Sequence, residues 1–378
     1  MGNCFAKAKI NITDSKDTTP KNDVKSTTKT SMTNLEIQAE QSKKIDQYLR
    51  KEKERLELED QDPKILILGS SDSGKSTFLK QLKILHGTGF SSEELKLSKM
   101  MLINNLLSIC QRIISEINDE IIVSVYQLIL DFCQSGTVNI SIGLPDDVVL
   151  QIIRFWEDRM VKDTLKRLGD LIPATTSFFL DKFQTIVHPD YVLNHQDMLL
   201  FRSVTQTVSK STFTIDTKTL HFFDVSGLKY HRKRWIPYFQ HVNCILYVIN
   251  LASYDQVLVE DGVTNRMRDA LDLYSKIYHH DLLSRTDHIL FFNKFDLYKI
   301  KIQQNPIKSY FTDFQGQPNS VSDGANYFQD LFKQFNKKGD RSVSVHLTCC
   351  TDTEVMKSII ISLTKSILNR RLDQITPT

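Results

Sequence analysis

The residues of this chain that could do chemistry begin with a loop of glycine, serine and lysine. Residues 69–76 read Gly-Ser-Ser-Asp-Ser-Gly-Lys-Ser and match the pattern G-x-x-x-x-G-K-[ST]. In such a loop the backbone N–H groups surround a phosphate, and the following helix N-terminus adds partial positive charge. We expect Lys75 to contact the β- and γ-phosphates and the Ser76 hydroxyl to bind Mg²⁺. Because a strand-like run precedes the loop and a helical pattern follows it, an ordinary Gly/Ser turn is the weaker interpretation. The predicted phosphate-loop residues are Gly69, Ser70, Ser71, Asp72, Ser73, Gly74, Lys75, Ser76 and Thr77.

A second motif, Asn293-Lys294-Phe295-Asp296, follows the apolar run HILFF. The Asp296 carboxylate can accept two hydrogen bonds from the N1–H and the 2-amino group of guanine, a donor pair that adenine lacks. The motif is weak alone, but its place after a strand and downstream of a phosphate loop indicates guanine. The segment Thr348-Cys349-Cys350 could supply the Cys350 N–H to the guanine O6. Taken alone, that segment would be interpreted as two buried structural thiols.

Two further segments could bind the γ-phosphate and the metal. Asp224 ends the run LHFFDV and could hold Mg²⁺ through water, while the Gly227 N–H could approach a γ-phosphate. In DMLLFRSVTQT, we predict that Leu199 lines the nucleotide, that Arg202 reaches over the phosphates and that Thr205 is the second protein ligand of Mg²⁺. Taken singly, Arg202 is better explained as a surface arginine and Thr205 as a loop hydroxyl. Their order relative to the other motifs favours one site.

These motifs form one site only if the chain brings them to one edge of a sheet. Short apolar or β-rich runs predict strands at 64–69, 213–225 (a hairpin), 244–252, 288–296 and 342–350. Helical patterns lie near 75–86, 256–279, 321–337 and 353–372. Strands that alternate with helices indicate an α/β fold, with a parallel sheet covered on both faces.

Two regions differ from this alternation. In residues 90–196, apolar residues recur at three- and four-residue steps, so we predict an all-helical insertion. Residues 1–34 are predicted to be a lipid anchor and flexible tether, since residues 11–34 are polar and nearly devoid of large apolar residues. Residues 35–62 are predicted to form a long, mostly polar helix that ends at Pro63. The α/β domain would then comprise 63–89 and 197–378.

Composition excludes several classes of protein. With 48 Lys+Arg against 45 Asp+Glu among 378 residues, the net charge of +3 is too balanced for binding nucleic acid through bulk charge. No apolar run approaches the roughly 18–20 residues of a membrane-spanning helix, and the first residues lack the apolar stretch of a secretory signal. Six cysteines without a C-x-x-C pair indicate neither a zinc module nor a disulfide framework. We therefore expect a soluble protein of a reducing compartment.

Taken in order, these motifs resemble those of the α subunits of heterotrimeric G proteins. The resemblance is carried by GSSDSGKST, DMLLFRSVTQT, DVSGLKYHRKRWI, NKFD and TCCTDT. It implies a Ras-like P-loop GTPase domain with an inserted all-helical domain, which binds GTP and GDP with Mg²⁺ and transduces signals from G protein-coupled receptors. It also implies that Arg202 is a built-in arginine finger. The segments around 199–206 and 225–241 would be the two switches that sense the γ-phosphate.

Several positions depart from the family pattern, and these substitutions lead to further expectations about hydrolysis. Leu228 stands where the family has the glutamine that orients the attacking water, and losing such a contact costs about 10²–10³ in rate. We therefore predict slow hydrolysis, with catalysis left to Lys75 and Arg202; the alternative is a GTP-loaded scaffold with negligible turnover. Ser226 replaces a glycine of the second switch, and Asp72 replaces the usual glutamate. A third reading, a P-loop kinase or ATPase, is disfavoured by the guanine motif.

The two ends of the chain bear on partners and membrane attachment. Gly2 suits myristoylation and Cys4 palmitoylation, although Ala6 stands where the acylation motif prefers Ser or Thr. Two acyl chains would hold the protein on the cytoplasmic face of the plasma membrane. The N-terminal helix resembles the family's docking surface for the βγ dimer. The polar ending with Pro377 makes coupling to an ordinary receptor doubtful, and the sequence does not identify the effector.

Overall fold

The computed structural model of the protein describes residues 62–375, except 118, 136–142, 204–206, 216, 241, 259, 338 and 340. The chain divides into two compact units, Met1–Glu59 and Asp60–Thr378, and only the second contains described residues. The predicted tether and nearly all of the predicted N-terminal helix lie outside the described residues, as do Gly2, Cys4, Thr205 and Pro377.

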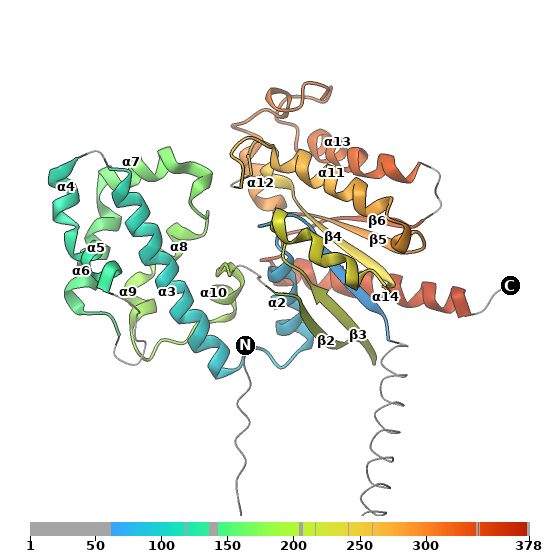
Figure 1. Ribbon diagram of the computed structural model, residues 1–378, viewed down its shortest axis with the longest axis horizontal. Coiled ribbons are helices and arrows are strands. Elements are labelled where there is room, and N and C mark those ends of the chain that lie inside the picture. The colour runs from blue at the N-terminus through green and yellow to red at the C-terminus, as the bar shows by residue number, and fades with distance from the viewer. Residues whose placement is uncertain are drawn as a thin grey trace, which may run out of the picture. The chain divides into compact units, whose positions relative to one another are not determined.

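A six-stranded sheet with the order β2-β3-β1-β4-β5-β6 lies beside the helices α3–α9 in the second unit (Figure 1). All neighbouring strands pair in parallel except β2 and β3, which form the predicted antiparallel hairpin. This arrangement confirms the predicted α/β fold with a mostly parallel sheet. The strands are β1 (Lys64–Leu68), β2 (Ser209–Ile215), β3 (Lys218–Asp224), β4 (Cys244–Asn250), β5 (Asp287–Asn293) and β6 (Val343–Leu347).

The sheet is buried because helices cover both of its faces (Figure 1). Leu66 and Leu68 belong to one apolar core, together with α11 (Arg266–Tyr278) and α13 (Val321–Lys333). Ile65 and Ile67 point to the opposite face, where they join α2 (Lys75–His86) and α14 (Thr353–Ile375). Alternate side chains of one strand therefore fill two cores, which explains why the central strands read as continuous apolar runs. The carboxyl ends of the strands are left free to form a site.

Several element boundaries differ from the predictions. The predicted strand 288–296 ends at Asn293, because Lys294 takes a left-handed conformation (φ 60°) and α12 (Phe295–Lys301) begins after it. The predicted strand 342–350 ends at Leu347. The predicted helix 256–279 begins only at Arg266, because the Asn265 side chain accepts the N–H groups of Met267 and Arg268 and caps that helix.

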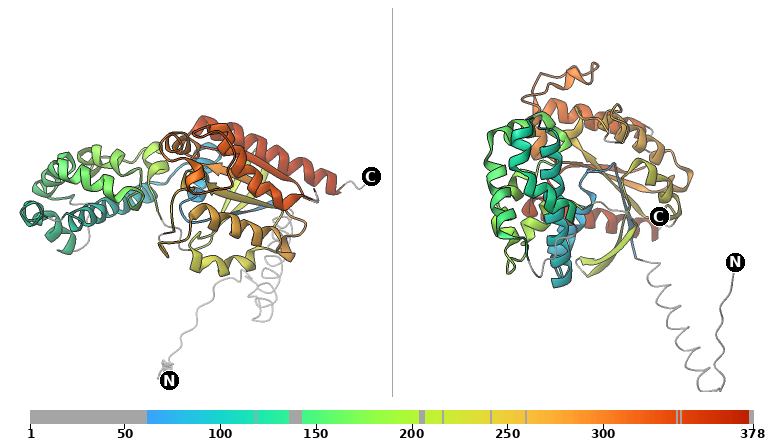
Figure 2. Two further views of the ribbon diagram at one scale, coloured as in Figure 1. Left: turned by 90° about the horizontal axis from the view of Figure 1, so that it is seen from above. Right: turned by 60° about the vertical axis from the view of Figure 1, so that its left-hand side comes forward.

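The described residues between α2 and β2 form helices and connecting loops, which confirms the all-helical insertion. The longest helix, α3 (Ser92–Ser115), begins with a capping box between Ser91 and Glu94. These helices have an apolar core of their own, and Figure 2 shows them from two further sides. Helix α10, the last of these helices, extends to Leu200, whereas the insertion is predicted to end at residue 196. The others are α4 (Glu120–Val125), α5 (Gln127–Ser135), α6 (Asp146–Glu157), α7 (Arg159–Leu168), α8 (Thr176–Asp181), α9 (Phe183–Val187) and α10 (His195–Leu200).

Candidate nucleotide site

The loop between β1 and α2 has a shape that only glycine permits at two positions. Gly69 and Gly74 have φ angles of 143° and 106°, which L side chains rarely adopt. A Cβ on Gly69 would lie 2.2 Å from the Val248 carbonyl oxygen, and one on Gly74 would lie 2.0 Å from the Asn293 Nδ2. The loop therefore packs its backbone directly on the ends of β4 and β5.

Lys75 is buried at the centre of this loop. Its Nζ donates to the Gly69 carbonyl over 3.0 Å and to the Ser70 carbonyl over 2.9 Å. Burial lowers the pKa of Lys75 to about 8, although the Asp224 carboxylate nearby favours its charged form. A buried ammonium group wrapped by a glycine loop at a helix N-terminus suits a phosphate ligand.

The two described residues that we predict to hold Mg²⁺ lie together. The Ser76 hydroxyl donates to the Asp224 Oδ2 over 3.1 Å, and Asp224 is buried at the end of β3. A hydroxyl and a carboxylate are the hard oxygen donors that Mg²⁺ prefers, so these residues fit the ion. Gly227 lies against the same loop, since a Cβ on it would be 2.5 Å from the Lys75 Nζ.

Three cationic side chains lie near the Asp72 carboxylate of this loop. Its carboxylate lies 3.0 Å from the Lys294 Nζ, 3.5 Å from an Arg266 Nη2 and 3.6 Å from the Arg202 Nε. Burial by itself would raise the pKa of Asp72, but the three cations outweigh it and lower the pKa to about 2. The predicted arginine finger is thus beside the loop. Arg266 also donates to the Ser71 carbonyl over 2.8 Å, a contact that the sequence analysis did not predict.

Asn293 connects the guanine motif to the phosphate loop. Its Nδ2 donates to the Ser73 carbonyl over 2.8 Å, and its Oδ1 accepts the Cys350 N–H over 2.9 Å. The N–H that we expect to meet the guanine O6 is therefore held by Asn293 in this structure. Asp296 is exposed in the first turn of α12, where its carboxylate is accessible to a base.

The segment that contains Leu199 and Arg202 is attached to both the insertion and α2. Lys80 of α2 donates to the carbonyls of Met198 and Phe201 over 2.9 and 2.7 Å, and Asn105 of α3 donates to the Arg202 carbonyl over 3.2 Å. Leu199 itself is buried in α10. These bonds fix the backbone from which the Arg202 side chain extends.

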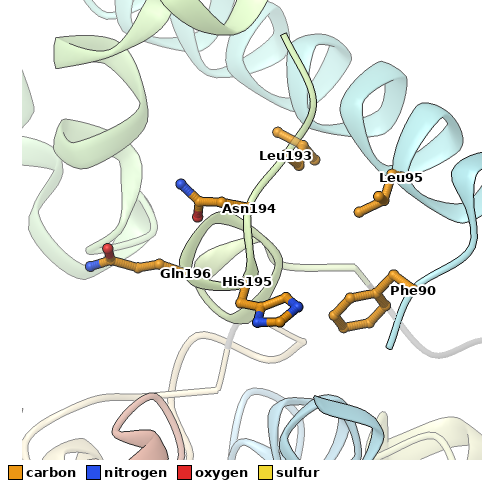
Figure 3. A pocket seen from close by; sticks show the side chains of 6 residues that line it. All are labelled: Phe90, Leu95, Leu193, Asn194, His195 and Gln196. Atoms are coloured by element: carbon orange, nitrogen blue, oxygen red, sulfur yellow. The ribbon is translucent and has the colours of Figure 1, made fainter. Parts of the chain in front are cut away.

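A separate hollow of about 520 Å³ lies where α3 and α10 begin (Figure 3). Figure 3 shows the Phe90 ring beside the His195 imidazole, and the two ring centroids are 6.3 Å apart. None of its lining residues belongs to the predicted site: they are Phe90, Leu95, Leu193, Asn194, His195 and Gln196. The hollow is thus distinct from the phosphate loop.

The sheet, the phosphate loop and the inserted helices together define a nucleotide-binding protein of the P-loop class. A sequence model of the family described as "G-protein alpha subunit" matches residues 39–367. The guanine nucleotide-binding protein alpha-2 subunit of Neurospora crassa is 31% identical over 350 residues, 90% of this chain and 97% of that protein. The guanine nucleotide-binding protein alpha subunits of Colletotrichum trifolii and Cryphonectria parasitica are each 32% identical over 316 residues, 82% of this chain and 89% of each relative.

The chain therefore belongs to the G-protein alpha subunit family and is an α subunit of a heterotrimeric G protein. Members of this family are GTPases that bind guanine nucleotide with Mg²⁺. Among the described residues, no helix combines the length and apolar character that crossing a membrane requires.

Proposed function

We propose that this α subunit is a GTP/GDP switch that hydrolyses GTP slowly and is therefore biased toward its GTP-bound form. The observation that carries the proposal is Leu228, which directly follows Gly227 and precedes the 3₁₀ segment η2 (Lys229–Tyr238). Its side chain can neither donate nor accept a hydrogen bond, so it cannot orient an attacking water. Removing one transition-state contact of this kind costs about 10²–10³ in rate, or roughly 3–4 kcal/mol.

The remaining residues support nucleotide binding and residual catalysis. Residues 69–77 would surround the phosphates with N–H groups, and Lys75 and Arg202 would stabilise the charge that develops on the γ-phosphate. Ser76, Thr205 and, through water, Asp224 would hold Mg²⁺. The ion, when bound, neutralises charge on the β- and γ-phosphate oxygens.

Selection of guanine would depend on the ends of β5 and β6. Asp296 would accept the two guanine donors, Lys294 would flank the base, and Asn293 and Cys350 would hold the two loops together. The contacts of Asn293 with Ser73 and Cys350 support this arrangement, because they join the guanine motif to the phosphate loop.

Release of the contact with Asp72 would free the Arg202 side chain to reach the nucleotide. The separation of 3.6 Å between the Arg202 Nε and the Asp72 Oδ1 is a weak contact, and Lys294 lies closer to that carboxylate. Because Lys294 and Arg266 still neutralise Asp72 after Arg202 has moved, the movement leaves no unpaired buried charge.

Family membership supports the partners that we propose. The protein would bind a βγ dimer, couple a G protein-coupled receptor to an effector and lie at the cytoplasmic face of the plasma membrane through acyl groups on Gly2 and Cys4. The polar C-terminus favours an unusual receptor interface.

The proposal is tested by loading the full chain with GTP in Mg²⁺ and following phosphate release in a single turnover, beside an Arg202→Ala variant. We expect tight GTP binding, slow release by the wild type and about 10²-fold slower release by the variant. Fast release by the wild type would contradict the proposal. The second candidate, a GTP-loaded scaffold, is favoured by Leu228 and predicts no measurable release from either protein.

A further inference from the structure

Ser226 makes two hydrogen bonds to the 3₁₀ segment that follows it. Its carbonyl accepts the Trp235 Nε1–H over 3.0 Å, and its hydroxyl lies 2.9 Å from the His231 Nδ1, with either atom able to donate. Ser226 and Trp235 are both buried, whereas His231 is half-buried. We call these two hydrogen bonds the Ser226 latch.

The latch adjoins the residue that would recognise the γ-phosphate. Gly227 is one peptide away from Ser226 and is packed so closely that a Cβ on it would lie 2.6 Å from the Ser70 carbonyl carbon. Lys75 lies against the same Cα, and its charge would bind the same phosphate. The Ser226 carbonyl and the Gly227 N–H belong to one planar peptide group. Hydrogen bonds that hold Ser226 therefore also hold the direction of the Gly227 N–H.

Two basic residues of η2 also form hydrogen bonds with carboxylates outside that segment. Arg232 donates two hydrogen bonds to the Asp269 carboxylate of α11, over 2.9 and 2.6 Å, and Lys229 donates to Asp261 over 3.1 Å. All of these bonds, like the latch, connect protein groups to one another. Together they favour the arrangement of the second switch seen here.

The hydroxyl bond of the latch depends on a residue that departs from the family pattern. Ser226 occupies a position where the family has glycine, which has no hydroxyl to offer to His231. In a buried segment that changes shape, a serine in place of glycine would be unfavourable unless its hydroxyl had a hydrogen-bond partner. The structure supplies that partner in His231.

We propose that His231 is a positioning residue for the γ-phosphate: through the Ser226 hydroxyl it holds the Gly227 N–H ready, and so favours GTP over GDP. This inference rests on the proposed function. His231 would act through Ser226 and would not itself touch the nucleotide. Since GDP has no γ-phosphate, the bond affects GTP binding and leaves GDP binding unchanged. One hydrogen bond of this kind corresponds to about three- to tenfold in affinity.

The experiment measures the affinities of the full-length wild type and four variants for a non-hydrolysable GTP analogue and for GDP, at one Mg²⁺ concentration. The variants are Ser226→Gly, His231→Ala, the double variant and His231→Asn, whose side chain can still bond the Ser226 hydroxyl. We expect both single variants to bind the analogue about three- to tenfold more weakly and GDP as before. The His231→Asn variant should keep the wild-type ratio, and the double variant should be no weaker than either single one.

Three results would overturn the inference alone: an equal loss for GDP and the analogue, a His231→Asn variant as weak as His231→Ala, or additive losses in the double variant. A wild-type protein that binds GDP but not GTP would overturn the proposed function, and this inference with it. Circular dichroism of each variant provides the control that the fold is kept.

Discussion

At the scale of single residues, the candidate site depends on polar atoms at the ends of strands. Asn293 shows this most clearly: it was predicted as a nucleotide ligand, and it joins Ser73 of the phosphate loop to Cys350 of the last strand end. Two loops that are far apart in sequence are thereby held in one arrangement before any base binds. Such preorganisation lowers the ordering cost of binding.

The guanine preference is tested at Asp296. An Asp296→Ala variant should lose at least about 10²-fold in GTP affinity, because two charge-assisted hydrogen bonds to the base disappear. Its weak binding of ATP should not change. Competitive displacement of a fluorescent nucleotide measures both affinities.

Glu354→Ala is the matched control, since Glu354 is also an exposed acid in the first turn of a helix, α14. It should bind GTP as the wild type does. If the Asp296 variant kept its GTP affinity, the assignment of Asp296 to the base would be wrong.

The sequence allowed the chemical motifs to be predicted, but not how they contact one another. Gly74 and Lys75 belong to a contiguous pattern with a known physical purpose, so a single stretch of sequence was enough to find them. Arg266 was missed because its contacts with Ser71 and Asp72 span nearly 200 positions and follow from tertiary packing. The available signal was a basic residue within the sequence Asn265-Arg266-Met267.

At the scale of secondary-structure elements, apolar runs predicted the strands well and the helix starts less well. Each central strand is buried on both faces, so its composition alone marks it. The predicted start of α11, at 256, is ten residues too early, although Gly262, with a φ angle of 67°, marks a turn within that stretch. There the Asp261 carboxylate accepts the N–H groups of Val263 and Thr264, and this turn competes with a helix.

The Asn265 cap gives a prediction for this element. Asn265→Ala should lower the free energy of unfolding by about 1–2 kcal/mol, because the first turn of α11 loses its side-chain acceptor. Denaturant titration measures the change.

Asn265→Asp is the informative control, since aspartate keeps the acceptor for Met267 and Arg268 but loses the donor to the Tyr254 carbonyl. We expect it to retain most of the stability. A loss as large as that of the alanine variant would show that the bond to Tyr254, and not the cap, is what matters.

At the scale of the whole molecule, a buried histidine links stability to pH. His288 of β5 is 1% exposed and lies among Tyr274, Tyr278 and Arg341. Within the described residues, neither of its ring nitrogens makes a hydrogen bond. Burial, assisted by the Arg341 charge, lowers the pKa of His288 to about 3.

The sign of the pH effect follows from this lowered pKa. The folded protein keeps His288 neutral, while the unfolded chain takes up its proton below about pH 6.5, so stability falls as the pH drops from 6.5 toward 3. At pH 5 the loss from this residue should be about 2 kcal/mol. A His288→Phe variant should show a shallower decline in denaturant titrations between pH 7 and 5, and an unchanged slope would contradict the assignment.

For the whole molecule, we propose that Leu228 makes GTP hydrolysis slow. The most direct test is single-turnover GTP hydrolysis by the wild type, Leu228→Gln and Leu228→Met, with methionine as an apolar control of similar size. We predict that glutamine raises the rate by about 10²-fold or more and that methionine leaves it unchanged. Equal rates for the wild type and the glutamine variant would show that another group already positions the water, and would contradict the account.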